Sequence, residues 1–498
     1  MFPRLMRRIA AAAKAVRAAR QSLDRAMRGR YSATALAFAF SLVAAVALAY
    51  PLFLPPYAGY ANDGSLDAVM QDTSLAQLPD TGYFDYYERT LRIVPSLEAS
   101  GMTPWPLRGA IRLAMAVDDA FSGDAFFDLR ALAAIYAVLY VPALFWTLWL
   151  AVRNMRTFTQ GVLIGAFGAM ILSDVGLVAR FASLYAQPLE LILSLYALNA
   201  LTTLALRAQC HALYPAVAAI LWVLAQLNPY AGASLFAICV LLVALSTRRG
   251  TVEARAMCVV TAVVLGLTGI TSLAQMRFRQ TEAQKYDSMT RGVLLTAKDP
   301  EVALAAFGID ARYATVTDTY AAQAVPYARL NAPALTSGFL DKYTSGWIAA
   351  YYVRHPGAAL SMLDAGMRAA LNARPDYIGN FERSAGRSAR AKAALFSLWS
   401  TFKIKTMPRT IGSLIGLIAI VMLLMRRLRG SMGARQMAVM LTLAGCMTIQ
   451  WLIAAVMGGD ALIARQAAMT GNYLDMMIYF AAAGSVHLLD FARTEGGK

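Results

Sequence analysis

The sequence predicts an all-α polytopic membrane protein with about ten transmembrane helices, a large first outer loop and a small outer domain. Of its 498 residues, 58% are apolar and only 15% are charged, and the mean hydropathy is +0.50. Soluble globular domains are nearer half apolar and a quarter charged. The composition therefore argues against a soluble cytosolic enzyme, a disordered chain, a collagen and a small disulfide scaffold.

Ten apolar runs are long enough, or nearly long enough, to cross a bilayer, which takes roughly 20 residues. They are 33–54, 129–152, 157–178, 187–206, 212–227, 230–247, 256–275, 411–426, 436–457 and 473–491. The first run follows a basic arm and no small-residue cleavage site follows it, so it is read as a helix and not as a signal peptide. In the third run, Gly161, Gly165 and Gly168 predict close contact with a neighbouring helix.

Basic residues predict the orientation of these spans. The first 30 residues hold nine Arg and Lys against one acid, and Arg or Lys also follows the second, fourth, sixth and eighth spans. Because Lys and Arg concentrate in cytoplasmic loops, both termini are predicted to be cytoplasmic in a multi-pass inner-membrane protein. The arm would lie on the anionic lipids of the inner leaflet. The net charge of +17 is thus read as a topology signal, and no nucleic-acid partner is expected.

The spans divide the chain into six predicted parts. They are a basic cytoplasmic amphipathic arm (1–32), a first transmembrane helix (33–54), an outer loop with a candidate catalytic acid (55–128), a transmembrane bundle (129–275), an extracytoplasmic domain with a basic interfacial end (276–410) and C-terminal transmembrane helices (411–498). The stretch 383–409 mixes Arg and Lys with aromatic residues, which predicts an interfacial helix near lipid phosphates.

Any chemistry is expected at the outer face. The cytoplasmic loops are short and hold no Walker loop or GxGxxG turn. The four cysteines lie in or beside apolar runs and only three histidines are present, which argues against a disulfide framework and a His-rich zinc site. An enzyme acting at the outer face needs an activated substrate that crosses the membrane or lives in it. Sugars linked to lipid phosphates meet that requirement.

Asp63, in the turn Asn62-Asp63-Gly64, is the first candidate for chemistry. A carboxylate held at the outer membrane surface can act as a general base toward an acceptor hydroxyl. Asn-Asp-Gly is also an ordinary turn sequence, and Asp63 would equally serve as the cap of a helix that begins near residue 65.

A second group of candidates lies where the third span ends and the fourth begins. Asp174 and Arg180 are charges near bilayer depth, which marks functional candidates, although a structural pair is the alternative. The helical pattern breaks at Tyr185 and Gln187, and broken backbone at this depth is tolerated where protein or a water-filled cavity covers it. Glu190 would face that cavity or interact with the dipole of its own helix.

Two further candidates lie apart from this group. His355 precedes a proline at an expected helix start, where a lone histidine is more often structural than catalytic. Arg465, in the last outer loop, has the fork geometry that matches phosphate oxygens, and a solvated surface position is its alternative.

Several short motifs, in this order, resemble the Wsf-type hexose transferases of bacterial wall and surface-layer glycans, which are multi-span members of the GT-C glycosyltransferase superfamily. They are Lys285-Tyr286-Asp287-Ser288-Met289-Thr290-Arg291, Tyr352-Val353-Arg354-His355-Pro356, Tyr377-Ile378-Gly379-Asn380-Phe381-Glu382 and Phe396-Ser397-Leu398-Trp399-Ser400. The Asn62-Asp63-Gly64 turn and the Tyr185-Ala186-Gln187-Pro188 segment fall where that family has comparable motifs. The resemblance covers most of the chain from about residue 33.

The resemblance implies a membrane glycosyltransferase that moves a hexose from a polyprenyl-phosphate donor to a glycan, polymer or lipid-linked acceptor, with inversion. Asp63 would be the general base. Asp67 or Asp174 would orient the acceptor or hold a divalent cation, if one is used. Gln187 stands where the family more often has an acidic residue, which argues against a cation at that position.

The same resemblance suggests which groups would face the sugar and the phosphate. Arg180, Arg291 and Arg465 would stabilise the charge that develops on the departing phosphate. Tyr185 and the region from Tyr286 would face the donor. The substrate-binding candidates are therefore Asp67, Asp174, Arg180, Tyr185, Gln187, Glu190, Tyr286, Arg291, His355 and Arg465.

Two other functions are compatible with a polytopic chain. A transporter or flippase for a lipid-linked glycan would show repeated spans, short loops and charges near the bilayer midplane. The sequence shows no repeat, two long outer segments and charges mainly at span ends. A non-catalytic membrane scaffold would need neither a carboxylate turn nor a broken helix beside it.

Overall fold

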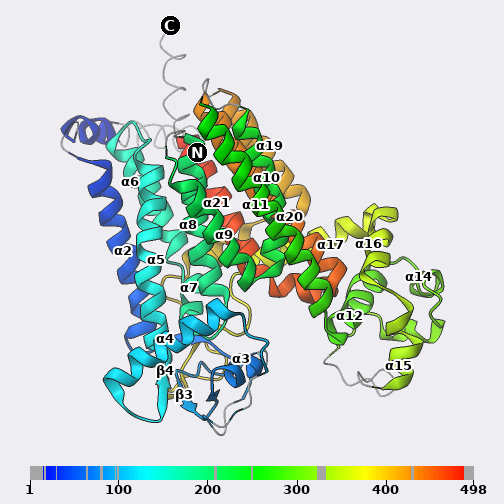
Figure 1. Ribbon diagram of the computed structural model, residues 1–498. Coiled ribbons are helices and arrows are strands. Elements are labelled where there is room, and N and C mark those ends of the chain that lie inside the picture. The colour runs from blue at the N-terminus through cyan, green and yellow to red at the C-terminus, as the bar shows by residue number, and fades with distance from the viewer. Residues whose placement is uncertain are drawn as a thin grey trace, which may run out of the picture.

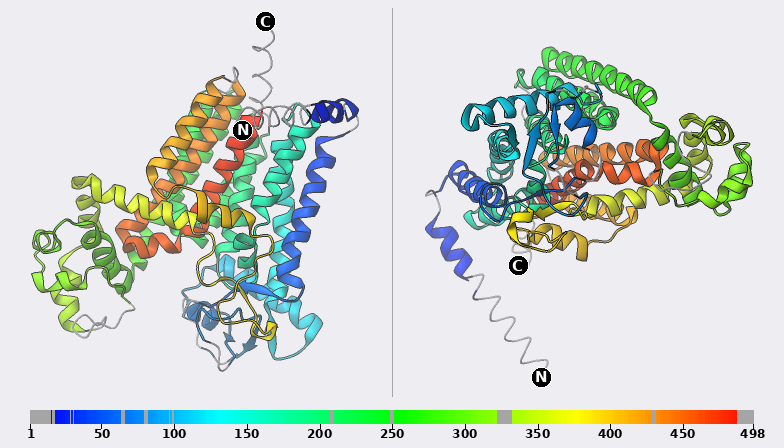
Figure 2. Two further views of the ribbon diagram at one scale, coloured as in Figure 1. Left: turned by 180° about the vertical axis from the view of Figure 1, so that it is seen from behind. Right: turned by 90° about the horizontal axis from the view of Figure 1, so that it is seen from below.

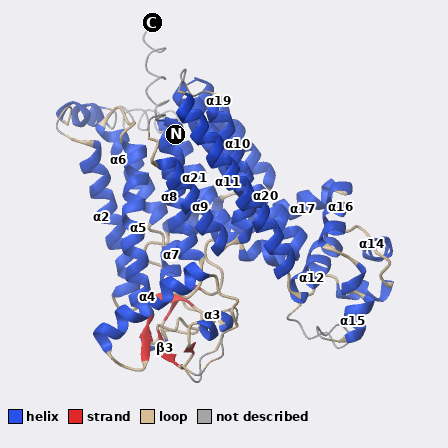
Figure 3. Cartoon of the chain, in the orientation of Figure 1, coloured by secondary structure: helices blue, strands red, loops and turns tan. Residues whose placement is uncertain are grey.

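The computed structural model shows a helical bundle with two additions, a loop domain beneath it and a lobe at its side (Figure 1). Helices make up most of the chain and strands are confined to short pieces (Figure 3). The structure describes residues 15, 18–27, 29, 31–62, 66–78, 82–95, 97, 100–206, 210–247, 251–321, 332–427 and 431–486.

Within these described residues, six helices are long and apolar enough to cross a membrane. They are α2 (Ala33–Phe53), α5 (Leu129–Val152), α8 (Gln187–Leu206), α10 (Pro229–Ser246), α11 (Val252–Arg279) and the part of α20 (Ser431–Arg465) that begins at Met437. The chain is therefore a multi-pass helical protein, as predicted. The start of α2 and the end of α21 (Ala467–Val486) lie at the same end of the bundle (Figure 1).

The predicted third span is a broken one. α6 (Phe158–Leu172) is followed after two residues by α7 (Val175–Val178) and a 3-10 turn, η1 (Ala179–Phe181), and the two parts are bent by 40°. Counting this pair as one span gives seven. Two other predicted spans correspond to shorter apolar helices, α9 (Leu213–Leu227) and α19 (Ile411–Arg427). The count of ten stays a prediction.

The glycines of α6 allow the close packing that their spacing predicted. A Cβ atom on Gly165 would lie 2.3 Å from the ring of Phe40 in α2. A Cβ atom on Gly168 would lie 2.5 Å from Leu148 in α5. A side chain at either position would therefore require Phe40 or Leu148 to move.

The first loop folds beneath the bundle, at the end that we call the loop end. It contains β1 (Ala58–Tyr60), α3 (Asp67–Asp72), β2 (Leu75–Ala76), β3 (Thr90–Ile93), α4 (Trp105–Ser122) and β4 (Phe126–Asp128). Strands β2, β3 and β4 form an antiparallel sheet. The carboxylate of Asp72 fastens this loop, because it accepts hydrogen bonds from Ser100 Oγ and from the backbone N–H groups of Gly101 and Thr103 at 2.6–2.9 Å.

Residues 282–354 form a helical lobe that projects sideways from the bundle (Figures 1 and 2). Its elements are α12 (Glu282–Ser288), the π-helical turn η2 (Met289–Val293), α13 (Leu294–Thr296), α14 (Pro300–Ala306), η3 (Ala311–Val316), α15 (Pro333–Gly338), η4 (Leu340–Lys342) and α16 (Ser345–Arg354). We call it the side lobe. α17 (Pro356–Leu371) then returns along the bundle and packs against α20 and α21.

An irregular strap, residues 372–397, runs from α17 back beneath the bundle. Its strand β5 (Ile378–Phe381) pairs antiparallel with β1, so the strap and the first loop are joined. A 3-10 turn, η5 (Arg383–Ala385), follows, and α18 (Leu398–Thr406) ends this region. The single interfacial helix predicted over 383–409 is therefore wrong. Residues 386–397 are irregular, and Trp399 and Lys403 of the short helix α18 are buried.

α20 is broken near its end. Gly458 and Gly459 have non-helical dihedral angles, and Gly459 has φ +60°, a conformation that favours glycine. A Cβ atom on Gly459 would also lie 2.7 Å from the backbone of Arg291 and of Asp287 in the side lobe. The break thus lets the side lobe sit directly against the helix.

Candidate active site

A polar cavity of about 340 Å³ lies where the third span is broken. α7 and η1 form one wall, the last turn of α17 and the start of the strap a second, α18 a third and the start of α21 the fourth. Its lining residues are Ile171, Asp174, Gly176, Leu177, Arg180, Ala370, Ala373, Trp399, Lys403, Ala467, Ala468, Gly471, Asn472 and Asp475. The sequence predicted irregular backbone beside a cavity at this depth, and the structure shows both.

Arg180 enters the cavity wall from η1 and is only 9% exposed. Its guanidinium donates to three neutral oxygen atoms, the carbonyls of Gly176 (3.1 Å) and Ala373 (3.5 Å) and the amide oxygen of Gln187. Among the described residues, no carboxylate lies within ion-pair distance of this guanidinium. The charge of Glu190 acts on it only over a longer distance. A buried charge without a counter-ion is costly, so this guanidinium is suited to an anion.

The second cation of the cavity, Lys403, is already paired. Its Nζ donates to Asp475 Oδ2 at 2.8 Å, and both side chains are nearly inaccessible to solvent. The other oxygen of Asp475 accepts from Trp399 Nε1 at 3.0 Å. This three-residue unit fixes α18 on α21 and closes one side of the cavity.

Asp174 is held by backbone groups. It caps α7 by accepting from the N–H of Gly176 at 2.8 Å, and its second oxygen accepts from the N–H of Ser400 at 2.8 Å. The side chain is 3% exposed. It therefore ties the broken span to α18, and its oxygens lie on the cavity wall beside the Lys403–Asp475 pair.

Two apolar cavities continue from the polar one into the bundle. The first, about 340 Å³, shares Leu177, Asn472 and Asp475 with it. The second, about 400 Å³, shares Ser194, Leu198 and Tyr473 with the first. The second is lined almost wholly by apolar side chains of α8, α9, α10, α20 and α21. The polar cavity and the two apolar cavities thus adjoin one another in a row, with the charged residues at one end.

Next to Arg180 is a stack of three tyrosines. The ring of Tyr60 in β1 stacks on Tyr185 at 4.0 Å between centroids and on Tyr377 of the strap at 5.0 Å. The stack joins the first loop, the strap and the break between the third and fourth spans. Tyr185 therefore contacts the first loop directly, through Tyr60, and its predicted role toward a substrate stays a prediction.

Asp63, the predicted general base, lies outside the described residues, as do residues 64 and 65. The residues on either side, Asn62 and Leu66, are buried. The carbonyl of Asn62 accepts from the N–H of Phe84 at 2.8 Å, and β1 leads into it. Asp67, at the start of α3, is exposed, and its Oδ2 accepts from the hydroxyl of Tyr83 at 3.3 Å.

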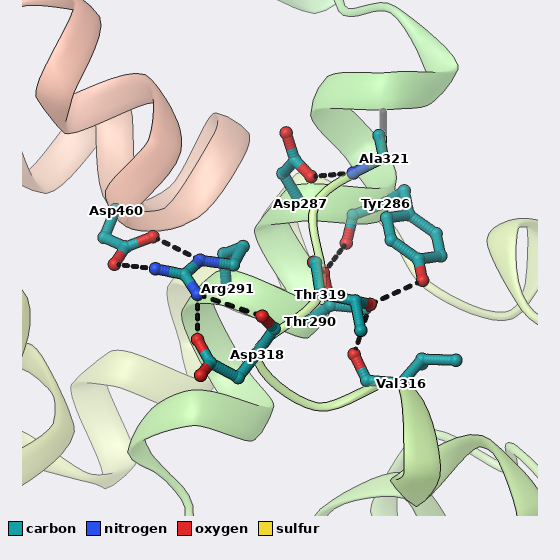
Figure 4. Close-up of polar contacts among 9 residues, drawn as sticks. All are labelled: Tyr286, Asp287, Thr290, Arg291, Val316, Asp318, Thr319, Ala321 and Asp460. Atoms are coloured by element: carbon teal, nitrogen blue, oxygen red, sulfur yellow. Dashed lines mark hydrogen bonds and ion pairs between the residues drawn. The ribbon is translucent and has the colours of Figure 1, made fainter. Parts of the chain in front are cut away.

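Arg291 lies in the side lobe, in a separate cluster (Figure 4). Its Nε and Nη2 donate to the two oxygens of Asp460 at 2.8 and 2.6 Å, and its Nη1 donates to the carboxylate of Asp318. The guanidinium also lies 4.2 Å from the ring centroid of Tyr320. Two carboxylates neutralise this cation. Arg291 is also not among the residues that line the polar cavity. Nearby, burial raises the pKa of the Asp287 carboxyl.

The remaining predicted residues lie at four different places in the structure. Tyr286, 1% exposed, shares a hydrogen bond with Thr319 at 2.8 Å in the side lobe. His355 is exposed and stacks on Tyr351 at 4.3 Å between α16 and α17. Glu190 lies in the first turn of α8, within hydrogen-bonding range of the Asn228 side chain. Arg465 is exposed at the end of α20.

No group of three or more His, Cys, Asp or Glu side chains that could hold a metal ion occurs among the residues that the structure describes. Asp67 and Asp174, the two predicted candidates for a cation, do not converge. Asp67 interacts with Tyr83, whereas Asp174 is occupied by two backbone N–H groups. The described residues therefore do not fit a divalent cation, and no step below depends on one.

Sequence reasoning missed part of the cavity. Lys403, Asp475 and Asn472 were not singled out, although Lys403 belongs to the basic stretch that drew attention for lipid contact. Arg374 was also missed; its side chain donates to the carbonyl of Ala393 at 2.6 Å, and burial lowers its pKa. Lys403 and Asp475 are 72 residues apart, and no local pattern links them.

Comparisons with known proteins place the chain in a family. The model of the family described as the YfdI N-terminal transmembrane domain matches residues 20–494. The chain belongs to this family. Membership of the YfdI N-terminal transmembrane domain family agrees with the multi-pass helical architecture. No match was found among curated proteins.

One solved structure similar to this chain is the archaeal oligosaccharyltransferase AglB from Archaeoglobus fulgidus, in complex with an inhibitory peptide and a dolichol-phosphate. The alignment covers 92% of this chain and 51% of AglB, with 14% sequence identity and a TM-score of 0.39. The chain thus spans about half the length of AglB.

Proposed function

We propose that this protein is a GT-C membrane glycosyltransferase that moves a hexose from a polyprenyl-phosphate donor to a glycan, polymer or lipid-linked acceptor. In this proposal it lies in the inner membrane with both termini in the cytoplasm, and its loop end faces outward. The shared position of the start of α2 and the end of α21 supports an even number of crossings (Figure 1). The basic residues after alternate spans support the direction.

The observation that carries the proposal is the environment of Arg180. Its charge is buried in a cavity wall and all three of its hydrogen-bond partners are neutral. A phosphate would supply the missing counter-charge, and guanidinium and phosphate have matching geometry. As the sugar leaves, negative charge grows on the phosphate, so a fixed cation at this position stabilises the transition state more than the ground state.

The apolar cavities support a lipid-linked donor. They extend from the polar cavity among α8, α9, α10, α20 and α21, where water-soluble ligands would gain nothing from apolar walls. A polyprenyl chain placed there would leave its phosphate beside Arg180. The hexose would then extend toward the tyrosine stack and the first loop.

In the proposed transfer, one base accounts for the proton and the phosphate leaves with the bonding electrons. Asp63 takes the proton of the acceptor hydroxyl while that oxygen attacks the anomeric carbon of the sugar. The bond from the anomeric carbon to the phosphate oxygen breaks, and its electron pair stays on polyprenyl phosphate. Attack from the side opposite the leaving group inverts the anomeric centre.

The first test is an assay of the purified protein in lipid with a panel of polyprenyl-phosphate hexoses, in the presence of a lysate-derived acceptor pool. Arg180→Met should lower polyprenyl-phosphate release about 100-fold, as expected for loss of one charge-stabilising donor. Arg312→Met is the matched control, because Arg312 is a surface residue of the side lobe with a 64% exposed side chain. Both variants should unfold near the wild-type temperature.

Release by Arg180→Met at the wild-type rate would contradict the role of the polar cavity. Release that is lost in Asp63→Asn, with unchanged binding of polyprenyl phosphate, would support Asp63 as the base. Unchanged release in Asp63→Asn would move the base elsewhere. If no donor gave any release, and the protein moved a lipid-linked glycan across the membrane of vesicles, the protein would be a flippase and the proposed enzyme function would be wrong.

A further inference from the structure

The side lobe exposes an apolar face on α16. Trp347, Ala350 and Val353 are spaced by three residues, which places them on one side of a helix. Trp347 is 54% exposed and Val353 is 82% exposed. The opposite side of α16 carries Ile348 and Tyr352, which are buried. An exposed tryptophan and valine on one face are unlike the scattered single apolar residues of an ordinary surface.

The position of α16 determines what can cover this face. The side lobe projects laterally from the bundle, and α16 lies beside α17 on the upper side of the lobe, level with the middle of the bundle, whereas α15 lies at the far end of the lobe (Figure 1). The reverse view shows the same arrangement (Figure 2). α11, whose exposed side chains Val263 (56%) and Ile270 (57%) are those of a lipid-facing helix, leads directly into the side lobe. Its last turn exposes Phe278 by 90%.

Basic groups border the same helix end. Arg354 and His355 are exposed where α16 meets α17, and the next exposed apolar side chain is Leu360, at 52%. Tryptophan beside arginine is typical of the interface between lipid headgroups and acyl chains. Arginine there keeps its charge at the phosphates while its stem stays in apolar surroundings.

We propose that the α16 face is seated in lipid at the side of the bundle. Trp347 and Val353 lie at the boundary of the acyl chains, and Arg354 lies at the phosphates. Lipid thus holds the side lobe beside the bundle, and this contact does not depend on the reaction proposed above.

The test measures the depth of a spin label in the full-length protein. All four native cysteines are replaced by alanine, and a nitroxide is attached at Val353→Cys in vesicles of phosphatidylethanolamine and phosphatidylglycerol. Collision rates with oxygen, which partitions into lipid, and with a water-soluble nickel chelate are compared. Val263→Cys on α11 is the lipid-facing reference, and Ser337→Cys, exposed on α15, is the water-facing reference.

The ratio of oxygen to nickel collisions at position 353 should exceed the ratio at 337 and approach the ratio at 263. Equal ratios at 353 and 337 would overturn the proposal. So would a label at 353 that is shielded from both reagents and broadened by a second label, because that result would show a second copy covering α16. Each labelled variant must unfold at the temperature of the cysteine-free protein, which the exposure of all three positions favours.

Discussion

Arg180 and Arg291 are buried to the same extent, each 9% exposed, yet their surroundings differ in kind. Arg291 is gripped by Asp460 and Asp318, and it joins the side lobe to the break in α20. Arg180 has only neutral partners and faces a cavity. The difference teaches that burial alone does not identify a ligand site. A cation whose charge the protein has not neutralised, at the edge of open space, does.

The largest expected effect is on stability, in Arg291→Met. Removing this buried cation leaves the half-buried carboxylate of Asp460 without its partner, and breaking such a pair costs up to about 4 kcal/mol. The free energy of unfolding in detergent should fall by that amount, while Arg180→Met should change it little. Equal losses in the two variants would remove the distinction between the two arginines.

Lys403→Met tests the pair inside the cavity. It should lower the free energy of unfolding by about 3 kcal/mol, because Asp475 would stay buried with only Trp399 as a partner. It should also lower polyprenyl-phosphate release, since it alters a cavity wall. Thermal unfolding and the release assay on the same preparation measure both. A variant that keeps wild-type stability would show that water compensates Asp475.

A double variant sharpens the structural role of Arg291. Adding Asp460→Leu to Arg291→Met removes the orphaned carboxylate, so about 2 kcal/mol of the lost stability should return. The measurement is a double-mutant cycle with Asp460→Leu alone as the fourth corner. Strict additivity of the two single effects would mean that the contact contributes nothing as a pair.

Asp72 is expected to give the smallest effect. It checks the comparison because it is a buried charge with neutral partners that lines none of the three cavities described above. Burial alone would raise its pKa, yet the hydrogen bonds from Thr103, Ser100 and Gly101 hold the pKa of this carboxyl well below its usual range. A depressed native pKa gives stability above the unfolded pKa, about 3.9, that is lost as the pH falls further.

Asp72→Asn should therefore be less stable than wild type by about 1.5 kcal/mol at neutral pH. The difference should shrink as the pH falls below 4, because the carboxyl of the unfolded wild-type chain then takes up a proton while the native carboxyl stays ionised. Chemical unfolding at a series of pH values measures it. A constant difference across pH would show that shape, and not charge, is what the loop requires.

Much of the fold follows from local sequence. Apolar runs predicted α5 and α8, because hydropathy is a property of consecutive residues. The irregular backbone before Gln187 was also expected, but the break after Leu172 was not, because the run 157–178 is apolar enough to be read as one span. The interfacial helix over 383–409 was wrong because its composition indicates polarity but not that β5 and its flanks pair with the first loop.

The site was less predictable. Arg180 and Asp174 stood out because charges are rare at membrane depth, and both line the polar cavity. Arg291 stood out through a motif, but its partner Asp460 lies 169 residues away and cannot be read from a single sequence. Asp63 lies outside the described residues and stays a prediction.

The glycine break in α20 has a mechanical consequence. Gly459 presses on the backbone of the side lobe, and Asp460 directly after it is bonded to Arg291. Five residues later the helix ends, and α21 begins as a wall of the polar cavity that includes Asp475. The contact with the side lobe and the cavity wall are thus joined by one short helical segment, residues 460–465. A displacement of the lobe would therefore reach the cavity wall through residues 460–465 alone, and a contact that fixes the lobe would also fix that wall.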